Sequence, residues 1–407
     1  MRILFLHRSF PGQFRYLATV LAHDLNNEVA FLTSAEARGI TGVNKVVYRP
    51  ARQVHPATHP YLKAVENAVL YGQAAFRAAV GLKRRGFVPD VILAHSGWGP
   101  SLFIQDVYPS TPLVSYFEWY YHAHGSSFDF DPRQRLSGDD KAEIRVKNTP
   151  ILFDLVNCAA GISPTEWQRS RLPAEFRAKV HTIHDGIDTD FFRPGADPEL
   201  GLPELGLDLA QLPEVVTYVA TGMEPLRGFG QFMEAVSLLH KRRPRLHAVV
   251  VGEDRVEYSA PLPGGKTYKQ DALDRFSFDL SRLHFTGRLN VEEFRRVLLA
   301  SSVHVYLTYP FILSWSVLEA MACGCLVIGS DTPPVREIIE NGVNGALVDF
   351  FAPRALADKV EEALDNTNKA ALLRRRARET ILAKYDVRSL LPRQAALLQA
   401  VAGRTGG

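Results

Sequence analysis

Short, almost wholly apolar runs alternate with longer amphipathic segments along most of this 407-residue chain. A short apolar run suits a strand that is buried on both faces, and an amphipathic segment suits a helix that covers such a sheet. This alternation is typical of an α/β protein with parallel sheets. The expected strands lie at 3–6, 29–32, 46–48, 91–94, 113–117, 161–163, 180–183, 215–220, 247–251, 283–286, 303–307, 326–329 and 346–348.

The amphipathic segments between these runs predict helices, because their apolar residues recur at helical spacing. The expected helices lie at 13–22, 61–84, 139–156, 229–242, 291–300, 316–323, 352–385 and 388–401. A polar segment at 253–281 stands between two of the strands, and long loops of this kind often cap a site.

The alternation is interrupted once, between residues 186 and 212, where Gly, Pro, Asp and Leu mix without a period. Such a texture indicates a connection between domains. We therefore expect two Rossmann-like domains facing a central cleft, over 1–190 and 195–385, with a C-terminal helix at 386–407 that packs back on the first domain. Ligands of such folds bind outside the carboxyl ends of the strands.

Composition excludes several classes. A net charge of +3 does not indicate a nucleic-acid-binding protein. Cys158, Cys323 and Cys325 form neither a disulfide framework nor a CxxC motif, and we interpret them as small buried hydrophobes. The first apolar run is too short for a signal peptide, and no stretch is long enough to span a membrane. We expect a cytoplasmic protein with no metal site and no cofactor, because no Asp, His or Cys cluster has ligand spacing.

The most informative segment is 314–328, where a turn leads into a short helix and Gly324 precedes another buried strand. Ser314, Trp315 and Ser316 stand at the expected helix start, whose free N–H groups favour an anion such as a diphosphate. Glu319 lies one turn further on, where its carboxylate can accept hydrogen bonds from ribose hydroxyls. Glycine closes such a helix at little cost in strain.

This segment resembles the donor-site signature of the retaining family-4 glycosyltransferases of GT-B fold. That family usually shows a glutamate, seven residues, a second glutamate, and then Ala-Met-Ala-x-Gly. Glu319 matches the second glutamate, to which the resemblance gives the ribose. The first glutamate, which approaches the transferred sugar, is replaced by Phe311. The backbone amides from Ile312 to Ser316 would then have to contribute more to donor binding than they do in the family.

Other segments resemble the family in the same order. The run 184–188, with Phe192 and Pro194, is similar to the family's segment at the domain linker. The run 221–228 is similar to its first donor loop, in which Gly222 lies and in which the family places an arginine and a lysine on the diphosphate. Arg227 takes the lysine's place, and its guanidinium suits phosphate oxygens. The earlier cation is replaced by Thr221.

Five further donor residues follow from the resemblance. Gly252 lies in a loop after a strand, and Gly287, Arg288 and Leu289 match the loop whose backbone faces the nucleobase, where a small residue permits close approach. Gly12 follows the first strand, at the place where family members often have a glycine-rich loop that approaches the donor phosphate. The segment around Gly12 lacks the GxGxxG of dinucleotide binders, which counts against a dehydrogenase.

In the first domain, residues 116–125 set Glu118 among four aromatic side chains just after a buried strand. Aromatic faces stack on sugars and a carboxylate bonds their hydroxyls. A subgroup of family-4 enzymes resembles this stretch and the 94–99 turn with His95. Many members carry a catalytic histidine at the place of Glu118, so Glu118 and His124 are candidate catalytic residues beside Arg227, with His122 close by in the sequence.

The resemblance implies a retaining, metal-independent glycosyltransferase that moves a hexosyl or N-acetylhexosaminyl group. The donor would be a UDP-sugar or, second, a GDP-sugar, and the acceptor a saccharide, a lipid-linked or a small-molecule hydroxyl in polysaccharide, glycolipid or glycoside biosynthesis. The basic run 83–85 is compatible with peripheral contact with anionic lipids. Two alternatives stay open: a nucleotide-sugar 2-epimerase of the same architecture, and a non-catalytic protein that binds nucleotide sugars.

Overall fold

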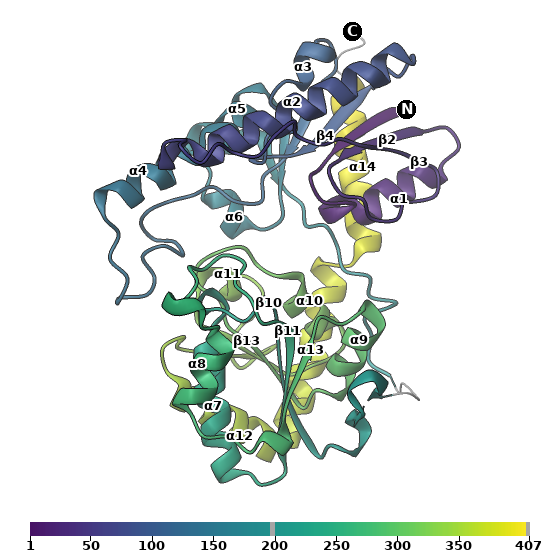
Figure 1. Ribbon diagram of the computed structural model, residues 1–407. Coiled ribbons are helices and arrows are strands. Elements are labelled where there is room, and N and C mark those ends of the chain that lie inside the picture. The colour runs from purple at the N-terminus through teal and green to yellow at the C-terminus, as the bar shows by residue number, and fades with distance from the viewer. Residues whose placement is uncertain (196–199, 404–407) are drawn as a thin grey trace. The chain divides into compact units, whose positions relative to one another are not determined.

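A computed structural model describes residues 1–195 and 200–403. The chain divides into two compact units: unit 1 comprises Met1–Gly186 and Val387–Gly407, and unit 2 comprises Ile187–Asp386. Residues 196–199, inside the expected connection, and 404–407, inside the expected C-terminal helix, lie outside the described residues. The α/β prediction is confirmed, because each unit is built on a parallel sheet with helices on both faces (Figure 1).

Unit 1 contains a seven-stranded parallel sheet in the order β3-β2-β1-β4-β5-β6-β7. Its strands are β1 (Arg2–Leu6), β2 (Glu28–Thr33), β3 (Val43–Val47), β4 (Val91–His95), β5 (Leu113–Tyr116), β6 (Ala160–Ser163) and β7 (Val180–Thr182). Alternate residues of β1 enter opposite cores: Ile3 and Phe5 pack with one set of helices, and Leu4 and Leu6 with the other. A strand buried on both faces must be apolar throughout, which explains the runs in the sequence.

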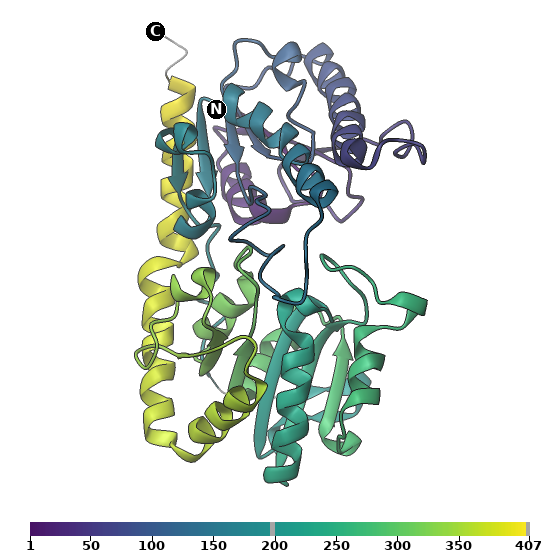
Figure 2. The same cartoon turned by 90° about the vertical axis from the view of Figure 1, so that its left-hand side faces the viewer.

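The helices of unit 1 cover both faces of this sheet. They are α1 (Arg15–His23), α2 (Lys63–Arg84), α3 (Ile104–Val107), α4 (Gly138–Val146), α5 (Thr149–Asn157), α6 (Glu166–Ser170) and α14 (Val387–Gly403), with short 3₁₀ turns at Gly12–Phe14, Pro60–Leu62 and Ala174–Lys179. The last helix, α14, packs beside α1 and β4 and runs along unit 1 (Figure 2).

The single helix expected at 139–156 is wrong, because the chain breaks into α4 and α5 at Lys147 and Asn148. The Asn148 side chain bonds the backbone of Tyr121 in both directions, at 2.9 and 2.8 Å, instead of continuing the helix. Pro150, in the first turn of α5, also lacks the N–H that a continuous helix would need.

Unit 2 contains a six-stranded parallel sheet in the order β12-β11-β10-β13-β14-β15. Its strands are β10 (Glu214–Gly222), β11 (Leu246–Glu253), β12 (Leu283–Gly287), β13 (Val303–Tyr306), β14 (Val327–Ser330) and β15 (Ala346–Val348), and a separate antiparallel pair is formed by β8 (Gly201–Leu202) and β9 (Leu207–Asp208). The strand order reverses between β10 and β13, and ligands of such sheets bind outside the carboxyl ends at this point.

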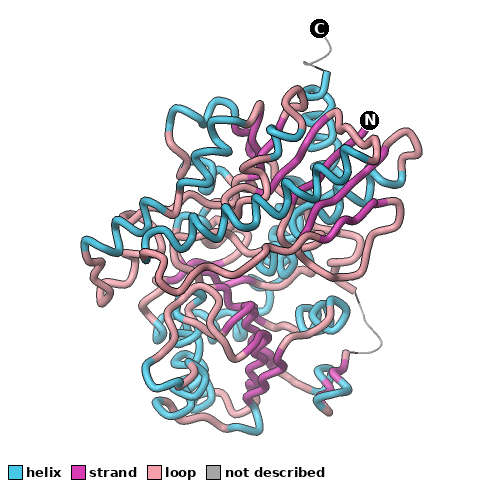
Figure 3. The backbone as a smooth tube through the Cα atoms, turned by 45° about the horizontal axis from the view of Figure 1, so that its top comes forward, coloured by secondary structure: helices cyan, strands magenta, loops and turns pink. Residues whose placement is uncertain are grey.

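The helices of unit 2 flank these strands (Figure 3). They are α7 (Phe229–Arg242), α8 (Tyr268–Arg275), α9 (Val291–Ala300), α10 (Trp315–Ala322), α11 (Pro333–Arg336), α12 (Pro353–Asp365) and α13 (Thr367–Lys384), with 3₁₀ turns at Pro203–Leu205, Leu209–Gln211, Pro225–Arg227, Pro263–Gly265 and Leu280–Arg282. The single helix expected at 352–385 is wrong. It breaks at Asn366, whose side chain accepts from the Lys369 N–H at 3.2 Å and so starts α13.

Candidate functional site

A cavity of about 530 Å³ opens in unit 2 beside the carboxyl ends of β10 and β11. Its walls also include the start of α9 and the start of α10. The lining residues are Val219, Ala220, Thr221, Val251, Gly252, Glu253, Arg255, Arg288, Leu289, Asn290, Val291, Phe294, Ser314, Trp315, Ser316 and Glu319. Seven predicted donor residues therefore lie on one cavity: Gly252, Arg288, Leu289, Ser314, Trp315, Ser316 and Glu319.

The start of α10 is fixed by local hydrogen bonds. Ser314 caps the helix, because its hydroxyl accepts from the Ser316 N–H at 3.3 Å. The Ser314 N–H donates to the Tyr306 hydroxyl at 2.9 Å. Two of the amides that the sequence offered to a ligand are thus bonded within the protein, while the positive end of the helix dipole still lies at the cavity wall.

The remaining length of α10 holds Glu319 in the cavity wall. Val317, Leu318, Ala320 and Met321 are buried in the core, whereas Glu319 is half-buried and lines the cavity. Gly324 ends the helix at a φ of +77°, as expected. A helix with one fully buried side and one carboxylate on the other keeps that carboxylate in a fixed place.

Arg227 is buried rather than lining the cavity. Its Nη1 donates to the Tyr306 hydroxyl at 3.1 Å, to Thr308 Oγ1 at 2.9 Å and to the Ile312 carbonyl at 3.2 Å. Over the described ranges no carboxylate lies within ion-pair distance of its guanidinium. The Tyr306 hydroxyl therefore connects this uncompensated positive charge to Ser314 in the cavity wall.

Glu224 is a residue that sequence reasoning missed. It is buried, and its Oε2 accepts three backbone N–H groups, from Glu257 at 3.0 Å, Tyr258 at 2.9 Å and Ser259 at 2.8 Å. These bonds fasten the start of the polar segment 253–281 to the loop that carries Arg227. The only sequence signal was a lone acid in that glycine-containing loop, since its partners lie more than thirty residues away.

Tyr258, in the polar segment 253–281, lies near both the first donor loop and Phe311. The Tyr258 ring lies 6.0 Å from the Arg227 guanidinium carbon and 5.2 Å from the Phe311 ring. Phe311, which stands where the family usually has a glutamate, is buried. Tyr258 thus lies between the Arg227 guanidinium and the Phe311 ring, and Phe311 supplies no negative charge there.

Two glycines let the strand ends of unit 2 approach each other. Gly252 has a φ of +141°, and a Cβ there would stand 2.1 Å from the Ala220 carbonyl oxygen. A Cβ at Gly222 would stand 2.5 Å from the Arg255 carbonyl oxygen. Gly287 ends β12 at a φ of +69° with open space around it. Of these three predicted donor residues, Gly252 lines the cavity, whereas Gly222 and Gly287 do not. A close backbone approach or a positive φ of this kind is tolerated best by glycine.

The candidates in unit 1 are placed differently from one another. Glu118 is half-buried and accepts a hydrogen bond from Gln13 Nε2 at 2.7 Å, and its other oxygen lies 3.6 Å from His95 Nε2. His124 does not join this group: its Nδ1 faces Asp129 at 3.3 Å and its side chain is 69% exposed. Gly12 lies against the ring of His7, so close that a Cβ would stand 2.5 Å from it.

The described residues contain neither a metal-binding cluster nor a membrane-spanning helix. Within 1–195 and 200–403 no group of three or more His, Cys, Asp or Glu side chains is arranged to hold a metal ion. No helix in the same residues is both long and apolar enough to cross a membrane. The three cysteines are free and buried, as predicted.

Two units, each built on a parallel sheet covered by helices, define a two-domain α/β protein of the GT-B type. Models of two protein families match the chain: "Glycosyl transferase family 4 group" over residues 25–192 and "Glycosyl transferases group 1" over residues 210–380. The chain belongs to the family-4, group 1 glycosyltransferases, as the sequence resemblance predicted.

Solved structures with the same fold cover nearly the whole chain. HepE of Anabaena in complex with UDP-glucose superposes with a TM-score of 0.69 at 17% identity, over 98% of this chain and 100% of that one. Sucrose-phosphate synthase of Thermosynechococcus elongatus gives a TM-score of 0.72 at 17% identity, over 99% and 100%. At this identity the likeness shows the GT-B fold alone.

Curated relatives match over a shorter stretch. Alpha-maltose-1-phosphate synthase of Mycobacterium tuberculosis is 27% identical over 232 residues, 55% of this chain and 56% of that protein. D-inositol 3-phosphate glycosyltransferase of Mycolicibacterium smegmatis is 27% identical over 240 residues, 54% and 51%. The chain thus spans about half the length of the curated relatives that it matches.

Proposed function

We propose that this protein is a retaining glycosyltransferase that binds a nucleoside-diphosphate sugar in the unit 2 cavity and transfers its sugar to an acceptor hydroxyl. The proposal rests on one observation: Glu319 lies in the cavity wall, and Arg227, which is buried and has no carboxylate partner among the described residues, lies behind that wall. A buried cation without a counterion is costly, and a diphosphate removes that cost. Glu319 accepts hydrogen bonds from the ribose hydroxyls.

The remaining donor residues take supporting roles in the proposal. The backbone at Gly287, Arg288 and Leu289 faces the base, and Gly222 and Gly252 leave room for the diphosphate beside the start of α10. Arg227 and the helix start stabilise the leaving diphosphate, which is preorganised electrostatic catalysis that needs no metal ion. In unit 1 Glu118 handles the acceptor hydroxyl, while His124 is tied to Asp129.

The donor is a UDP-sugar in the first instance and a GDP-sugar in the second, and the group is a hexosyl or N-acetylhexosaminyl group. The structurally similar HepE forms a complex with UDP-glucose, which supports the first choice. The acceptor is a saccharide, a lipid-linked or a small-molecule hydroxyl in polysaccharide, glycolipid or glycoside synthesis, in the cytoplasm and in peripheral contact with the membrane.

The test is calorimetric titration of the purified protein with UDP and with GDP. We expect one of them to bind, and Glu319→Gln to weaken that binding about 30-fold, since losing hydrogen bonds to a charged acceptor costs about 2 kcal/mol. Glu292→Gln is the matched control, because Glu292 is exposed on the neighbouring helix α9. The donor site would be refuted if neither UDP nor GDP binds, or if Glu319→Gln binds the nucleotide as tightly as the wild type does.

Incubation with UDP-glucose and no acceptor separates the proposed reaction from its alternative. A glycosyltransferase releases UDP slowly, because water takes the place of the acceptor. A nucleotide sugar recovered with inverted configuration at C2 would instead establish an epimerase.

A further inference from the structure

The wall of the unit 2 cavity contains two arginines, Arg255 and Arg288. The first donor loop adds no cation to this wall, because Thr221 is neutral, Gly222 has no side chain and Arg227 is buried behind the wall. A nucleoside diphosphate carries several negative charges at neutral pH. A cation that is exposed to such a ligand in the cavity therefore comes from one of these two side chains.

The sheet order distinguishes Arg255 from Arg288. Arg255 follows β11, which is a neighbour of β10, whereas Arg288 follows β12, which β11 separates from β10. The backbone of Arg255 lies against the end of β10, since a Cβ on Gly222 would stand 2.5 Å from the Arg255 carbonyl oxygen. The helix α10 follows β13, the other neighbour of β10. The topology thus sets Arg255 nearer than Arg288 to the start of α10, where the diphosphate is proposed to bind.

Two carboxylates hold the Arg255 guanidinium. Its Nε donates to Glu253 Oε2 at 2.8 Å, and its Nη1 donates to Glu257 Oε2. Its Nη2 has no hydrogen-bond partner within residues 1–195 and 200–403, and the side chain is 47% exposed. A guanidinium carries five N–H donors in one plane. Arg255 can therefore bond both carboxylates and still offer the N–H groups of Nη2 to a further anion.

The segment that carries Arg255 is fastened to the rest of unit 2 at two places. Glu224 Oε2 accepts the three successive N–H groups of 257–259. The Thr267 hydroxyl, at the start of α8, donates to Asp254 Oδ2 at 3.1 Å. These bonds lie on either side of Arg255 in the sequence, so the guanidinium is presented to the cavity by an ordered backbone.

Glu224 serves this segment and does not line the cavity. It is buried, and its Oε1 has no hydrogen-bond partner in the described part of the chain. A buried carboxylate is costly, and here the bonds that offset its cost are the three that Oε2 accepts from 257–259. The effect of Glu224 on a ligand is therefore transmitted through the backbone that follows Arg255.

We propose that Arg255 is a second cation of the donor site, and that its Nη2 binds a diphosphate oxygen of the nucleotide sugar. This inference rests on the proposed function and adds to it a residue outside the predicted motifs. Arg255 contacts the ligand from the cavity wall, whereas Arg227 acts from behind the wall. Glu224 does not touch the ligand and is a positioning residue, because it holds 257–259 and through them the guanidinium.

Calorimetry with UDP or GDP, whichever binds, and with the matching nucleoside tests the contact. We expect Arg255→Met to lower the affinity for the diphosphate about tenfold, since a half-exposed charge-assisted bond contributes less than a buried one. The affinity for the nucleoside, which has no phosphate, should not change. The dependence of the diphosphate affinity on salt should become less steep, because one charge is removed from the contact.

Arg275→Met is the matched control for Arg255→Met. Arg275 lies in the same polar segment and also bonds a carboxylate, Asp271 at 3.2 Å, but it does not line the cavity. Its replacement should leave both affinities and the salt dependence as they are. The proposal is overturned if Arg255→Met keeps the wild-type affinity and salt dependence, or if its affinity for the nucleoside falls as much as that for the diphosphate. Failure of the wild type to bind either nucleotide overturns the proposed function instead.

A double-mutant cycle tests the positioning role. Glu224→Ala removes the acceptor of three N–H groups, and we expect it to lower diphosphate affinity about tenfold by itself but less than twofold when Arg255→Met is already present. Glu224→Gln should restore most of the affinity, because its amide oxygen can accept the same N–H groups. If Glu224→Ala does not fold, Glu224→Asp takes its place, since its carboxylate is withdrawn by one methylene. Losses that add up fully in the double variant overturn the positioning role.

Discussion

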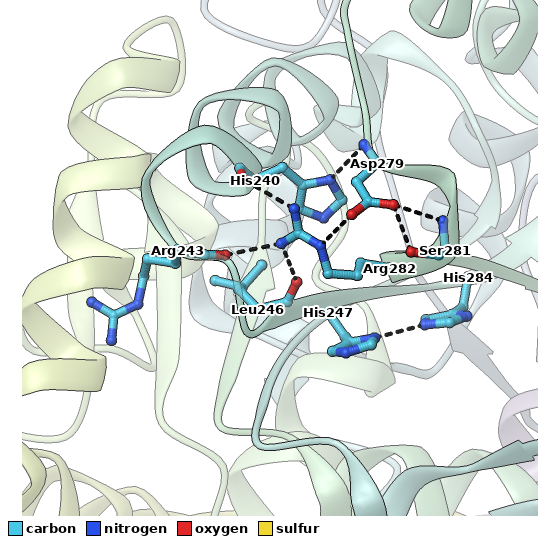
Figure 4. Close-up of polar contacts among 8 residues, drawn as sticks. All are labelled: His240, Arg243, Leu246, His247, Asp279, Ser281, Arg282 and His284. Carbon is cyan, nitrogen blue, oxygen red and sulfur yellow. Dashed lines mark hydrogen bonds and ion pairs between the residues drawn. The ribbon is translucent and has the colours of Figure 1, made fainter.

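Unit 2 holds two arginines that are largely buried but are bonded in opposite ways. Arg282, on the 3₁₀ turn before β12, donates to four groups: Asp279 Oδ2 at 2.8 Å, the carbonyls of Arg243 and Leu246 at 2.9 and 3.1 Å, and that of His240 at 3.1 Å (Figure 4). Arg227 donates through Nη1 alone, and only to neutral oxygens.

The difference separates a structural arginine from one that is kept for a ligand. Asp279 neutralises Arg282, and the three carbonyls tie the end of α7 and the start of β11 to the turn before β12. Arg227 has no such carboxylate among the described residues, so the fold bears the cost of a buried charge. Binding of an anion offsets this free-energy cost, and we therefore assign Arg227, and not Arg282, to the diphosphate.

The largest effect should come from Arg227→Met. We expect affinity for the nucleoside diphosphate to fall about 100-fold, because charge-assisted bonds to phosphate contribute about 2–3 kcal/mol. The thermal midpoint should stay close to that of the wild type, since an uncompensated buried charge is removed at the same time. Calorimetry and thermal unfolding of the same preparation measure both. Wild-type affinity in this variant would mean that the diphosphate is held elsewhere.

Arg282→Met should give the reverse result. The change leaves Asp279 without its cation and three carbonyls without a donor, and we expect a loss of about 2 kcal/mol in the free energy of unfolding. Nucleotide affinity should be unchanged, because Arg282 lies at the amino ends of the strands and the cavity at their carboxyl ends. Urea denaturation and calorimetry measure the two quantities. A weakened nucleotide affinity would erase the contrast between the arginines.

Local patterns allowed much of this fold to be predicted. Two helices, α7 and α9, have the expected bounds, because each carries a clear apolar stripe and α9 also starts at an Asn290 cap. The breaks at Asn148 and Asn366 were missed, since they depend on what a single side chain bonds. The helix α8 was missed as well, although Thr267 and Gln270 form a capping box that could have indicated it.

The site was predictable to the extent that its residues are neighbours in the sequence. Glu319 and the serines of α10 lie in one short motif, and they share one cavity. Gln13 was not singled out, because its partner Glu118 is 105 residues away and no local pattern links the two. The engaged N–H of Ser314, at the start of α10, depends on Tyr306, which precedes it by a loop. Contacts between strand ends are fixed by the sheet order, which the sequence does not state.

The smallest effect should come from a change of pH. It tests the histidines that lie around Arg282, the structural arginine of the two. Burial lowers the pKa of His240 to about 4, and burial first and a nearby positive charge second lower the pKa of His247 and His284. His247 Nδ1 and His284 Nε2 lie 3.1 Å apart, so the pair can hold only one proton between its rings (Figure 4).

The unfolded chain has histidines with a pKa near 6.5, so between about pH 4 and 6.5 it binds more protons than the folded chain. The contribution of these histidines to the free energy of unfolding is therefore fully present above pH 6.5, and it is lost as the pH falls through this window. We expect His240→Gln to flatten the fall by on the order of 1 kcal/mol, and His181→Gln to leave it unchanged. Urea denaturation at a series of pH values measures this. If the two variants follow the wild type equally, His240 does not couple to folding in this pH window.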